Sequence, residues 1–198
     1  PISELSGYKY FLTLLKELSK GQIINSIESL IQYLVDNKHL LNFHIQTSGT
    51  TSVPKLINVK VSNCIRYVKR SKEKYNKIWG MGYPHGSFAS TQVFFQSLMN
   101  KETIIYLFGV DFKTSDQVFS NYKITNLSCT PTFLSMLLMN LKNEYSSVSK
   151  ITTGGEKMKN SLIGSFKKTF PFAEYINIYA STEAGSLLYS TTEYFSIP

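Results

Sequence analysis

Strand-like segments alternate with amphipathic helical segments along most of this chain, and this alternation limits the possible folds more than any other feature. Helical periodicity or helix-start signals predict helices at 8–20, 23–35, 62–77, 88–99, 115–122 and 160–170, and one that begins at the Thr130–Pro131 pair. Strands are predicted at 41–46, 56–61, 103–108, 124–128, 150–153 and 174–179, with a short apolar segment around Trp79. This order predicts an α/β fold with a largely parallel sheet flanked by helices, whose ligand loops lie at the carboxyl ends of the strands.

One loop between two predicted strands is crowded with small hydroxyl residues and glycine. It reads Thr47, Ser48, Gly49, Thr50, Thr51, Ser52, Val53, Pro54 and Lys55. Gly49 lets the backbone turn so that successive N–H groups point at an anion, and Lys55 adds a compact positive charge. The loop therefore suits a polyphosphate, although it is not a Walker A loop, because Pro54 and Leu56 flank the lysine. An ordinary polar turn is the alternative interpretation.

Two further loops carry residues that a nucleotide site needs. Residues 152–156 form a strand end that opens into a glycine turn, and residues 179–185 follow the last predicted strand. An aromatic face can stack on a base, a hydroxyl can hold a phosphate, and a carboxylate can hold magnesium. All three loops follow predicted strands, so we expect them to converge on one magnesium-nucleotide complex.

With these three loops in this order, the chain resembles the AMP-forming acyl and aryl ligases. This adenylate-forming family includes acyl-CoA synthetases, luciferases and peptide-synthetase adenylation domains. The family's phosphate loop, Thr-Ser-Gly-Thr-Thr-Gly-x-Pro-Lys, is similar to residues 47–55, with Ser52 in place of a glycine. Its Tyr-Gly-x-Thr-Glu segment is similar to residues 179–183, with Ala180 in place of a glycine, and its Gly-Gly-Glu turn is similar to residues 154–156.

The resemblance implies a role for each matched residue. The β and γ phosphates of ATP would be wrapped by Thr47, Ser48, Gly49, Thr50, Thr51 and Lys55. The adenine would be bordered by Gly154, Gly155 and Glu156, and Tyr179 would stack on it. Ala180 and Ser181 would belong to the same nucleotide-binding segment. Within this segment, Thr182 would contact the α-phosphate and Glu183 would hold Mg²⁺. The expected catalytic residues are Thr182, Glu183 and Lys55.

The implied reaction is ATP-dependent activation of a carboxylic acid. The substrate carboxylate would attack the α-phosphorus and expel pyrophosphate, and the acyl group would pass to coenzyme A, a carrier-protein thiol or an amine. Family members continue to an aspartate in a Thr-Gly-Asp context and to a small C-terminal domain with a catalytic lysine, whereas this sequence ends at Pro198. Residues 1–198 are therefore expected to be part of the large adenylation domain, with residues 1–40 as a helical lead-in and with weak nucleotide binding and little turnover. A degenerate, non-catalytic nucleotide-binding or scaffolding module is the alternative, motivated by Ser52 and Ala180.

The segment after the phosphate loop has a counterpart in the family that helps to line the acyl pocket. Residues 83–89 occupy that region, and the family's histidine position falls on either His85 or Ser87. Phe88, Phe94 and Phe95 are interpreted as core residues rather than pocket walls.

A formal net charge of +8 suggests a polyanionic partner. Much of it comes from one run, made of Arg66, Lys69, Arg70, Lys72, Lys74 and Lys77. We interpret this run as the solvated face of a helix, because it matches no recognised nucleic-acid module. A nucleic-acid binder is the alternative, but the prediction is that no nucleic acid is a partner.

Cysteines, histidines and apolar runs give no sign of a cysteine- or histidine-based metal site, a disulfide framework or a membrane protein. Cys64 and Cys129 lie in apolar surroundings without paired spacing, so we expect buried packing, and His39, His44 and His85 are too scattered to assign a metal. No apolar run approaches the ~20 residues of a membrane span, and no secretory signal is visible. The sequence therefore predicts a cytoplasmic protein without a membrane span.

Overall fold

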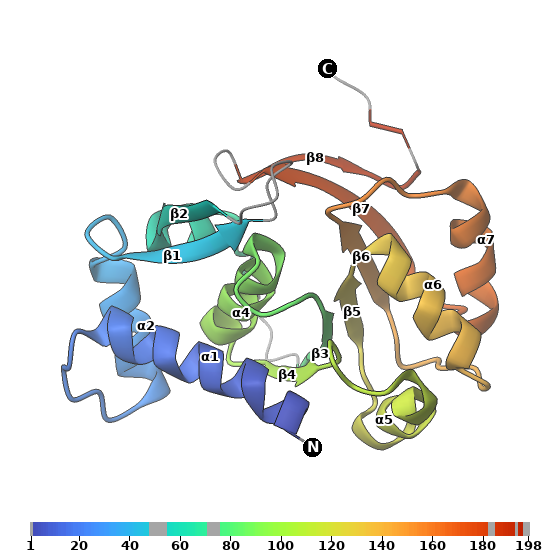
Figure 1. The fold of residues 1–198 in the computed structure, drawn as a ribbon, viewed down its shortest axis with the longest axis horizontal. Coiled ribbons are helices and arrows are strands. Elements are labelled where there is room, and N and C mark those ends of the chain that lie inside the picture. The colour runs from blue at the N-terminus through green and yellow to red at the C-terminus, as the bar shows by residue number, and fades with distance from the viewer. Residues whose placement is uncertain (1, 48–54, 71–75, 182–184, 193, 196–198) are drawn as a thin grey trace. The chain divides into compact units, whose positions relative to one another are not determined.

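The computed structural model describes residues 2–47, 55–70, 76–181, 185–192 and 194–195 of the chain (Figure 1). These residues form two compact units, one made of Pro1–Tyr75 and Pro84–Glu102 and the other of Asn76–Tyr83 and Thr103–Pro198. We call them unit 1 and unit 2. The chain crosses between the units after Tyr75, after Tyr83 and after Glu102.

Unit 1 contains four helices and a β-hairpin among its described residues. The helices are α1 (Ile2–Ser19), α2 (Ile27–Asp36), α3 (Val61–Ile65) and α4 (Phe88–Asn100), and the strands are β1 (Asn42–Thr47) and β2 (Lys55–Lys60). Helix α2 begins later than its apolar pattern predicts, because Ser26 and Ser29 form a capping box at its start. The core of unit 1 includes the stacked rings of Phe11 in α1 and Phe94 in α4, whose centroids lie 4.3 Å apart.

The helix predicted at 62–77 is confirmed at 62–65 but wrong beyond them, because α3 ends at Ile65 and residues 66–70 are not helical. The backbone of Lys69 is hydrogen bonded instead to side chains of α4. Its N–H donates to Gln96 Oε1 at 3.1 Å, and its carbonyl accepts from Gln96 Nε2 at 3.0 Å and from Asn100 Nδ2 at 3.2 Å. These bonds satisfy backbone groups that a continuing helix would have to satisfy internally. The described part of the basic run is therefore not a helix face.

Unit 2 is built on a six-stranded sheet. Its strands are β3 (Ile78–Gly82), β4 (Thr103–Tyr106), β5 (Asn126–Cys129), β6 (Lys150–Gly154), β7 (Glu174–Ser181) and β8 (Gly185–Ser190), in the spatial order β4-β3-β5-β6-β7-β8. All neighbours pair in parallel except β7 and β8, so the predicted largely parallel sheet is confirmed. Strand β8 was not predicted, because residues 179–185 were interpreted as a loop after the last strand; it pairs antiparallel with β7.

The hairpin of unit 1 is not part of this sheet. Strands β1 and β2 pair antiparallel as a separate two-stranded sheet, with Thr47 opposite Lys55. The expectation that all three loops lie at the carboxyl ends of one parallel sheet is therefore wrong for the phosphate loop. The reason is geometric, since antiparallel strands can be joined by a short loop whereas parallel strands need a long crossover.

Three α-helices of unit 2 pack on the same face of its sheet (Figure 1). The helical elements are the 3₁₀ turn η1 (Phe112–Thr114), α5 (Ser115–Tyr122), α6 (Pro131–Asn140) and α7 (Asn160–Thr169). They share one apolar core with the strands, in which Phe119, Leu137 and Phe166 are fully buried. The predicted start of α6 is confirmed, since Thr130 Oγ1 accepts a hydrogen bond from the N–H of Phe133 and Pro131 is the first helical residue.

Strand β3 and helix α6 approach so closely at Gly82 that a side chain has no room. A Cβ at this position would lie 2.5 Å from Cδ1 of Phe133 and 2.7 Å from Cβ of Cys129. We expect Gly82→Ala to lower the free energy of unfolding by about 1–3 kcal/mol, because buried groups must shift to admit the methyl group. Urea denaturation measures this change.

Gly164 in α7 provides the matched control, since nothing lies within 4 Å of a Cβ built there. Gly164→Ala should raise the free energy of unfolding by up to about 1 kcal/mol, because alanine favours helix. Equal effects of the two substitutions would contradict the close packing at Gly82.

The Asp116 carboxylate gives unit 2 an acid-sensitive contact. It accepts hydrogen bonds from the Tyr145 hydroxyl at 2.6 Å, the Lys142 N–H at 2.9 Å and the Asn143 amide at 2.8 Å. These bonds, that of Tyr145 first, hold the pKa of Asp116 below its ordinary value of 3.8. A carboxyl with a lowered folded-state pKa stabilises the fold above its unfolded-state pKa, and this contribution is lost as the pH falls through the folded-state pKa.

We therefore expect Asp116→Asn to reduce the free energy of unfolding at pH 7, with a difference from the parent protein that shrinks as the pH falls below 3.8. Tyr145→Phe should also weaken the acid dependence, because it removes the first of these donors. Denaturation curves between pH 7 and the acid transition measure both effects. A difference that stays constant with pH would argue against the assigned contact.

Candidate functional site

Two of the three predicted loops are neighbours at the carboxyl edge of the unit 2 sheet. Strands β6 and β7 pair in parallel, with Gly154 opposite Ile178. The turn Gly154–Gly155–Glu156 therefore lies beside Tyr179, the residue that follows Ile178. Figure 1 shows β6 and β7 as adjacent strands that end on the same side. We call this pair of segments the β6–β7 edge.

The glycines of the turn meet two different physical demands. A Cβ on Gly154 would lie 2.9 Å from the carbonyl oxygen of Ile178, so a side chain would push the two strands apart. Gly155 has φ of +83°, a conformation that other residues rarely adopt. None of the described residues lies within 4 Å of a Cβ built on Gly155, so this part of the structure leaves space above the turn.

The Glu156 carboxylate ties this turn to helix α6. It accepts hydrogen bonds from the backbone N–H of Thr132 at 3.0 Å and from the Thr132 hydroxyl. Thr132 lies in the first turn of α6, where N–H groups lack helical partners and a negative charge is favourable. Sequence analysis missed Thr132, and its only signal is its place next to the predicted helix start at Thr130–Pro131.

Tyr179 presents its ring at the surface. Its side chain is 53% exposed and its ring lies 5.9 Å from that of Phe195. The pairing of β7 with β8 shifts register between Tyr179 and Ala180, an irregularity that re-aims side chains. The non-glycine residues with positive φ in the described chain are Lys20, Lys101 and Lys123, so Ala180 replaces the family's glycine without that strain.

Buried hydroxyl groups fix the strands beneath the turn. Thr152 Oγ1 donates to Ser128 Oγ at 2.7 Å, which links β6 to β5. Thr153 Oγ1 lies 2.7 Å from the Tyr175 hydroxyl, which links β6 to β7. Sequence analysis assigned no role to these side chains, because hydroxyl residues in strands carry no distinctive pattern. Their bonds make the β6–β7 edge a fixed platform.

Burial raises the pKa of several tyrosine and cysteine side chains, of which Tyr83, Tyr175 and Cys129 belong to unit 2 and Cys64 to unit 1. It raises the pKa of Tyr83, and it raises the pKa of Tyr175 to about 12. It also raises the pKa of the thiols of Cys129 and Cys64, the latter to about 12. Both cysteines are free and buried, which confirms the prediction of packing roles. These thiols are poor nucleophiles, since the thiolate is the reactive form.

The phosphate loop is described only at its two ends. Thr47 ends β1 and Lys55 begins β2 directly opposite it, so the loop closes a hairpin. Ser48, Gly49, Thr50, Thr51 and Ser52 lie outside the described residues, as do Thr182 and Glu183. Ser181 is described only as the last residue of β7. The roles assigned to these residues stay predictions.

The segment 83–89 divides between the two units after Tyr83. Ser87 caps α4 by accepting a hydrogen bond from the Ser90 N–H at 3.1 Å, and the His85 ring lies 5.4 Å from that of Tyr10. Phe94 and Phe95 are buried, as predicted for core residues, and Phe88 is partly buried.

Neither a cluster of metal-ligating side chains nor a membrane-spanning helix occurs among the described residues. Across 2–47, 55–70, 76–181, 185–192 and 194–195, no three or more His, Cys, Asp or Glu side chains gather as a metal site. In the same ranges, no helix combines the length and the apolar character needed to cross a membrane.

Curated relatives match most of this chain. A plipastatin synthase of Bacillus subtilis (strain 168) is 26% identical over 149 residues, which cover 70% of this chain and 6% of the relative. PF 1022-synthetase of Rosellinia sp. is 26% identical over 169 residues, which cover 77% of this chain and 5% of the relative. The chain thus spans a small share of either protein.

A solved structure shares the fold. The adenylation domain AlmE of Vibrio cholerae, in complex with glycyl-adenosine-5'-phosphate, superposes with a TM-score of 0.66 at 20% identity. The match covers 84% of this chain and 33% of AlmE. The sequence model of the family described as AMP-binding enzyme matches residues 33–196. The chain therefore belongs to the family of AMP-binding enzymes.

Proposed function

We propose that this chain is part of an ATP-dependent ligase that activates a carboxylic acid as an acyl adenylate. In this reaction a carboxylate oxygen attacks the α-phosphorus of ATP, the bond from that phosphorus to the bridging oxygen of the β-phosphate breaks, and pyrophosphate leaves. A thiol of coenzyme A or of a carrier protein, or an amine, then attacks the acyl carbonyl carbon, the bond from that carbon to the phosphate oxygen breaks, and AMP leaves. The observation that carries the proposal is the β6–β7 edge, where an open glycine turn lies beside an exposed tyrosine.

The β6–β7 edge has the properties that an adenine site requires. Gly155 leaves open space above the turn, and the exposed Tyr179 ring offers an apolar face on which a base can stack. The AlmE complex holds a glycyl adenylate, a compound of the class that we propose as the product here. Family membership and this geometry together support ATP as the nucleotide.

The remaining roles follow the sequence prediction. The loop residues Thr47, Ser48, Gly49, Thr50, Thr51 and Lys55 would bind the β and γ phosphates, and Thr182 would bind the α-phosphate. Glu183 would hold Mg²⁺, which neutralises phosphate charge when it is bound. Positioning and charge stabilisation by these residues would supply most of the catalysis, without a covalent nucleophile from the protein.

A non-catalytic module of the same fold is the second candidate. It is motivated by Ser52 and Ala180 at two glycine positions of the family motifs. Ala180 has no positive φ, so its methyl group adds no strain of that kind, which favours the ligase. Exchange of labelled pyrophosphate into ATP, measured on the full-length protein with a panel of carboxylic acids, separates the two. ATP binding without any exchange would identify the non-catalytic module.

We expect Lys55→Ala to weaken binding of magnesium-ATP by about tenfold to a hundredfold, because it removes a charge-assisted hydrogen bond to a phosphate. Isothermal titration calorimetry measures this change. Lys9→Ala removes the same charge from an exposed position on α1 and should leave the affinity unchanged. Equal affinity of the Lys55→Ala and parent proteins would remove the phosphate role from this loop.

Tyr179 and Tyr189 offer a matched pair for the adenine contact, because their side chains are 53% and 54% exposed on neighbouring strands. Tyr179→Ala should weaken ATP binding by about fivefold to a hundredfold, since loss of one aromatic–base stack typically has this effect. The same substitution should leave binding of inorganic pyrophosphate unchanged, because pyrophosphate has no base. Tyr189→Ala should change neither affinity. If both tyrosine variants weaken ATP binding equally, the assigned stack is wrong.

A further inference from the structure

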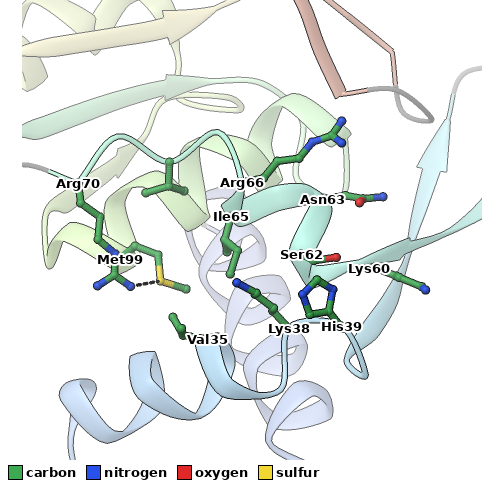
Figure 2. A pocket seen from close by; sticks show the side chains of 11 residues that line it. Val35, Lys38, His39, Lys60, Ser62, Asn63, Ile65, Arg66, Arg70 and Met99 are labelled. Atoms are coloured by element: carbon green, nitrogen blue, oxygen red, sulfur yellow. Dashed lines mark hydrogen bonds between the residues drawn. The ribbon is translucent and has the colours of Figure 1, made fainter.

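We infer that unit 1 carries a second anion site, separate from the phosphate loop, which binds a small molecule with two or more phosphate groups. The site is a cavity of about 650 Å³ between the turn after α2, the start of α3 and the segment that follows α3 (Figure 2). We call it the basic cavity. Its lining residues are Val35, Lys38, His39, Lys60, Ser62, Asn63, Ile65, Arg66, Val68, Arg70 and Met99.

The charge of the lining has one sign. Lys38, Lys60, Arg66 and Arg70 supply four cations from separate points of the chain, and none of the described lining residues is a carboxylate. Like charges around one concave surface repel one another, and the potential that they create attracts a polyanion. Ser62 and Asn63 add neutral hydrogen-bond donors to the same lining.

Hydrogen bonds fix the backbone that carries these cations. The Lys38 carbonyl accepts from the Ser62 N–H at 2.9 Å, which joins the turn after α2 to the start of α3. The three bonds from Lys69 to α4 hold the non-helical segment that carries Arg66 and Arg70. The cations are therefore arranged by the fold and do not belong to one solvated helix face.

Side-chain contacts also restrain both arginines. The Arg66 guanidinium lies over the Tyr67 ring, 4.5 Å from its centroid, and Arg70 Nη2 donates to Met99 Sδ at 3.7 Å. Figure 2 shows Lys38 and His39 rising from the turn after α2 towards α3, with Arg70 reaching towards Met99 from another side. Cations held in this way lose less conformational entropy when they bind a ligand.

The size and chemistry of the cavity favour a phosphate-bearing small molecule over a nucleic acid. Its volume lies in the range of small-molecule sites, and its charged groups donate hydrogen bonds but accept none. Among the described lining residues His39 is the only one with a ring, so this part of the lining does not offer the set of aromatic faces on which unpaired bases stack. The inference does not depend on the proposed ligase, because none of the described residues of segments 47–55, 154–156 and 179–183 lines the cavity.

The probe is inorganic tripolyphosphate without magnesium, titrated calorimetrically into the full chain and its Lys55→Ala variant at low and moderate salt. The amide resonances of Ser62 and Asn63 locate binding, because both residues line the cavity. We expect these resonances to shift in both proteins, with saturable binding in each. A nucleoside triphosphate is titrated in parallel, and tighter binding than tripolyphosphate that also shifts the Ser62 and Asn63 resonances would show that the ligand of the basic cavity is a nucleotide rather than free polyphosphate.

Two double variants of equal net charge distinguish binding in the basic cavity from general electrostatic attraction to a positively charged protein. Lys38→Gln/Lys60→Gln should weaken tripolyphosphate binding to the Lys55→Ala protein by about tenfold for each cation removed. Lys9→Gln/Lys16→Gln removes two exposed charges from α1, outside the cavity, and should leave this affinity within about twofold.

Several results would overturn the inference. Equal weakening by both double variants would show only a general response to net charge. Loss of all tripolyphosphate binding on Lys55→Ala alone would place the anion in the phosphate loop instead. Unchanged Ser62 and Asn63 resonances at saturation would place it elsewhere, and tighter binding of single-stranded RNA than of tripolyphosphate would show that the ligand class is wrong.

Discussion

The parallel pairing of β6 with β7 is the constraint on which the candidate site depends. It sets Gly154 opposite Ile178, so that a glycine turn and an aromatic residue, which lie far apart in sequence, leave the sheet side by side. The hydroxyl bonds of Thr152 and Thr153 hold the same strands to their neighbours. Polar groups buried in this way must keep their partners, because an unsatisfied one is costly, and the register of the edge is therefore firmly held.

Sequence reasoning succeeded where the signal is local. Helix α5 has the predicted bounds, and α6 begins at the predicted Thr130–Pro131 pair, because caps and hydrophobic period act over a few residues. The alternation of these elements also predicted the parallel sheet. The described parts of two of the three predicted loops, recognised by residue type and order, do meet at one edge.

The features that sequence reasoning missed depend on partners distant in the chain. Glu156 meets Thr132 across 24 residues, and Lys69 meets Gln96 across 27. In each case a side chain from a distant part of the chain forms a hydrogen bond with a backbone group, and local propensity does not reveal which partner that group will have. The antiparallel hairpin around the phosphate loop was also unforeseen, since strand-like segments alone do not specify their neighbours.

The hydrogen bonds between Glu156 and Thr132 connect the glycine turn to helix α6, and the glycine content of the turn does not reveal this connection. A turn with two glycines would by itself be a hinge, free to follow whatever presses on it. Here its third residue is fastened to a helix whose other side is embedded among Leu127, Ile151 and Phe166. The position of the turn is therefore coupled to that of helix α6, which shares the buried core of unit 2.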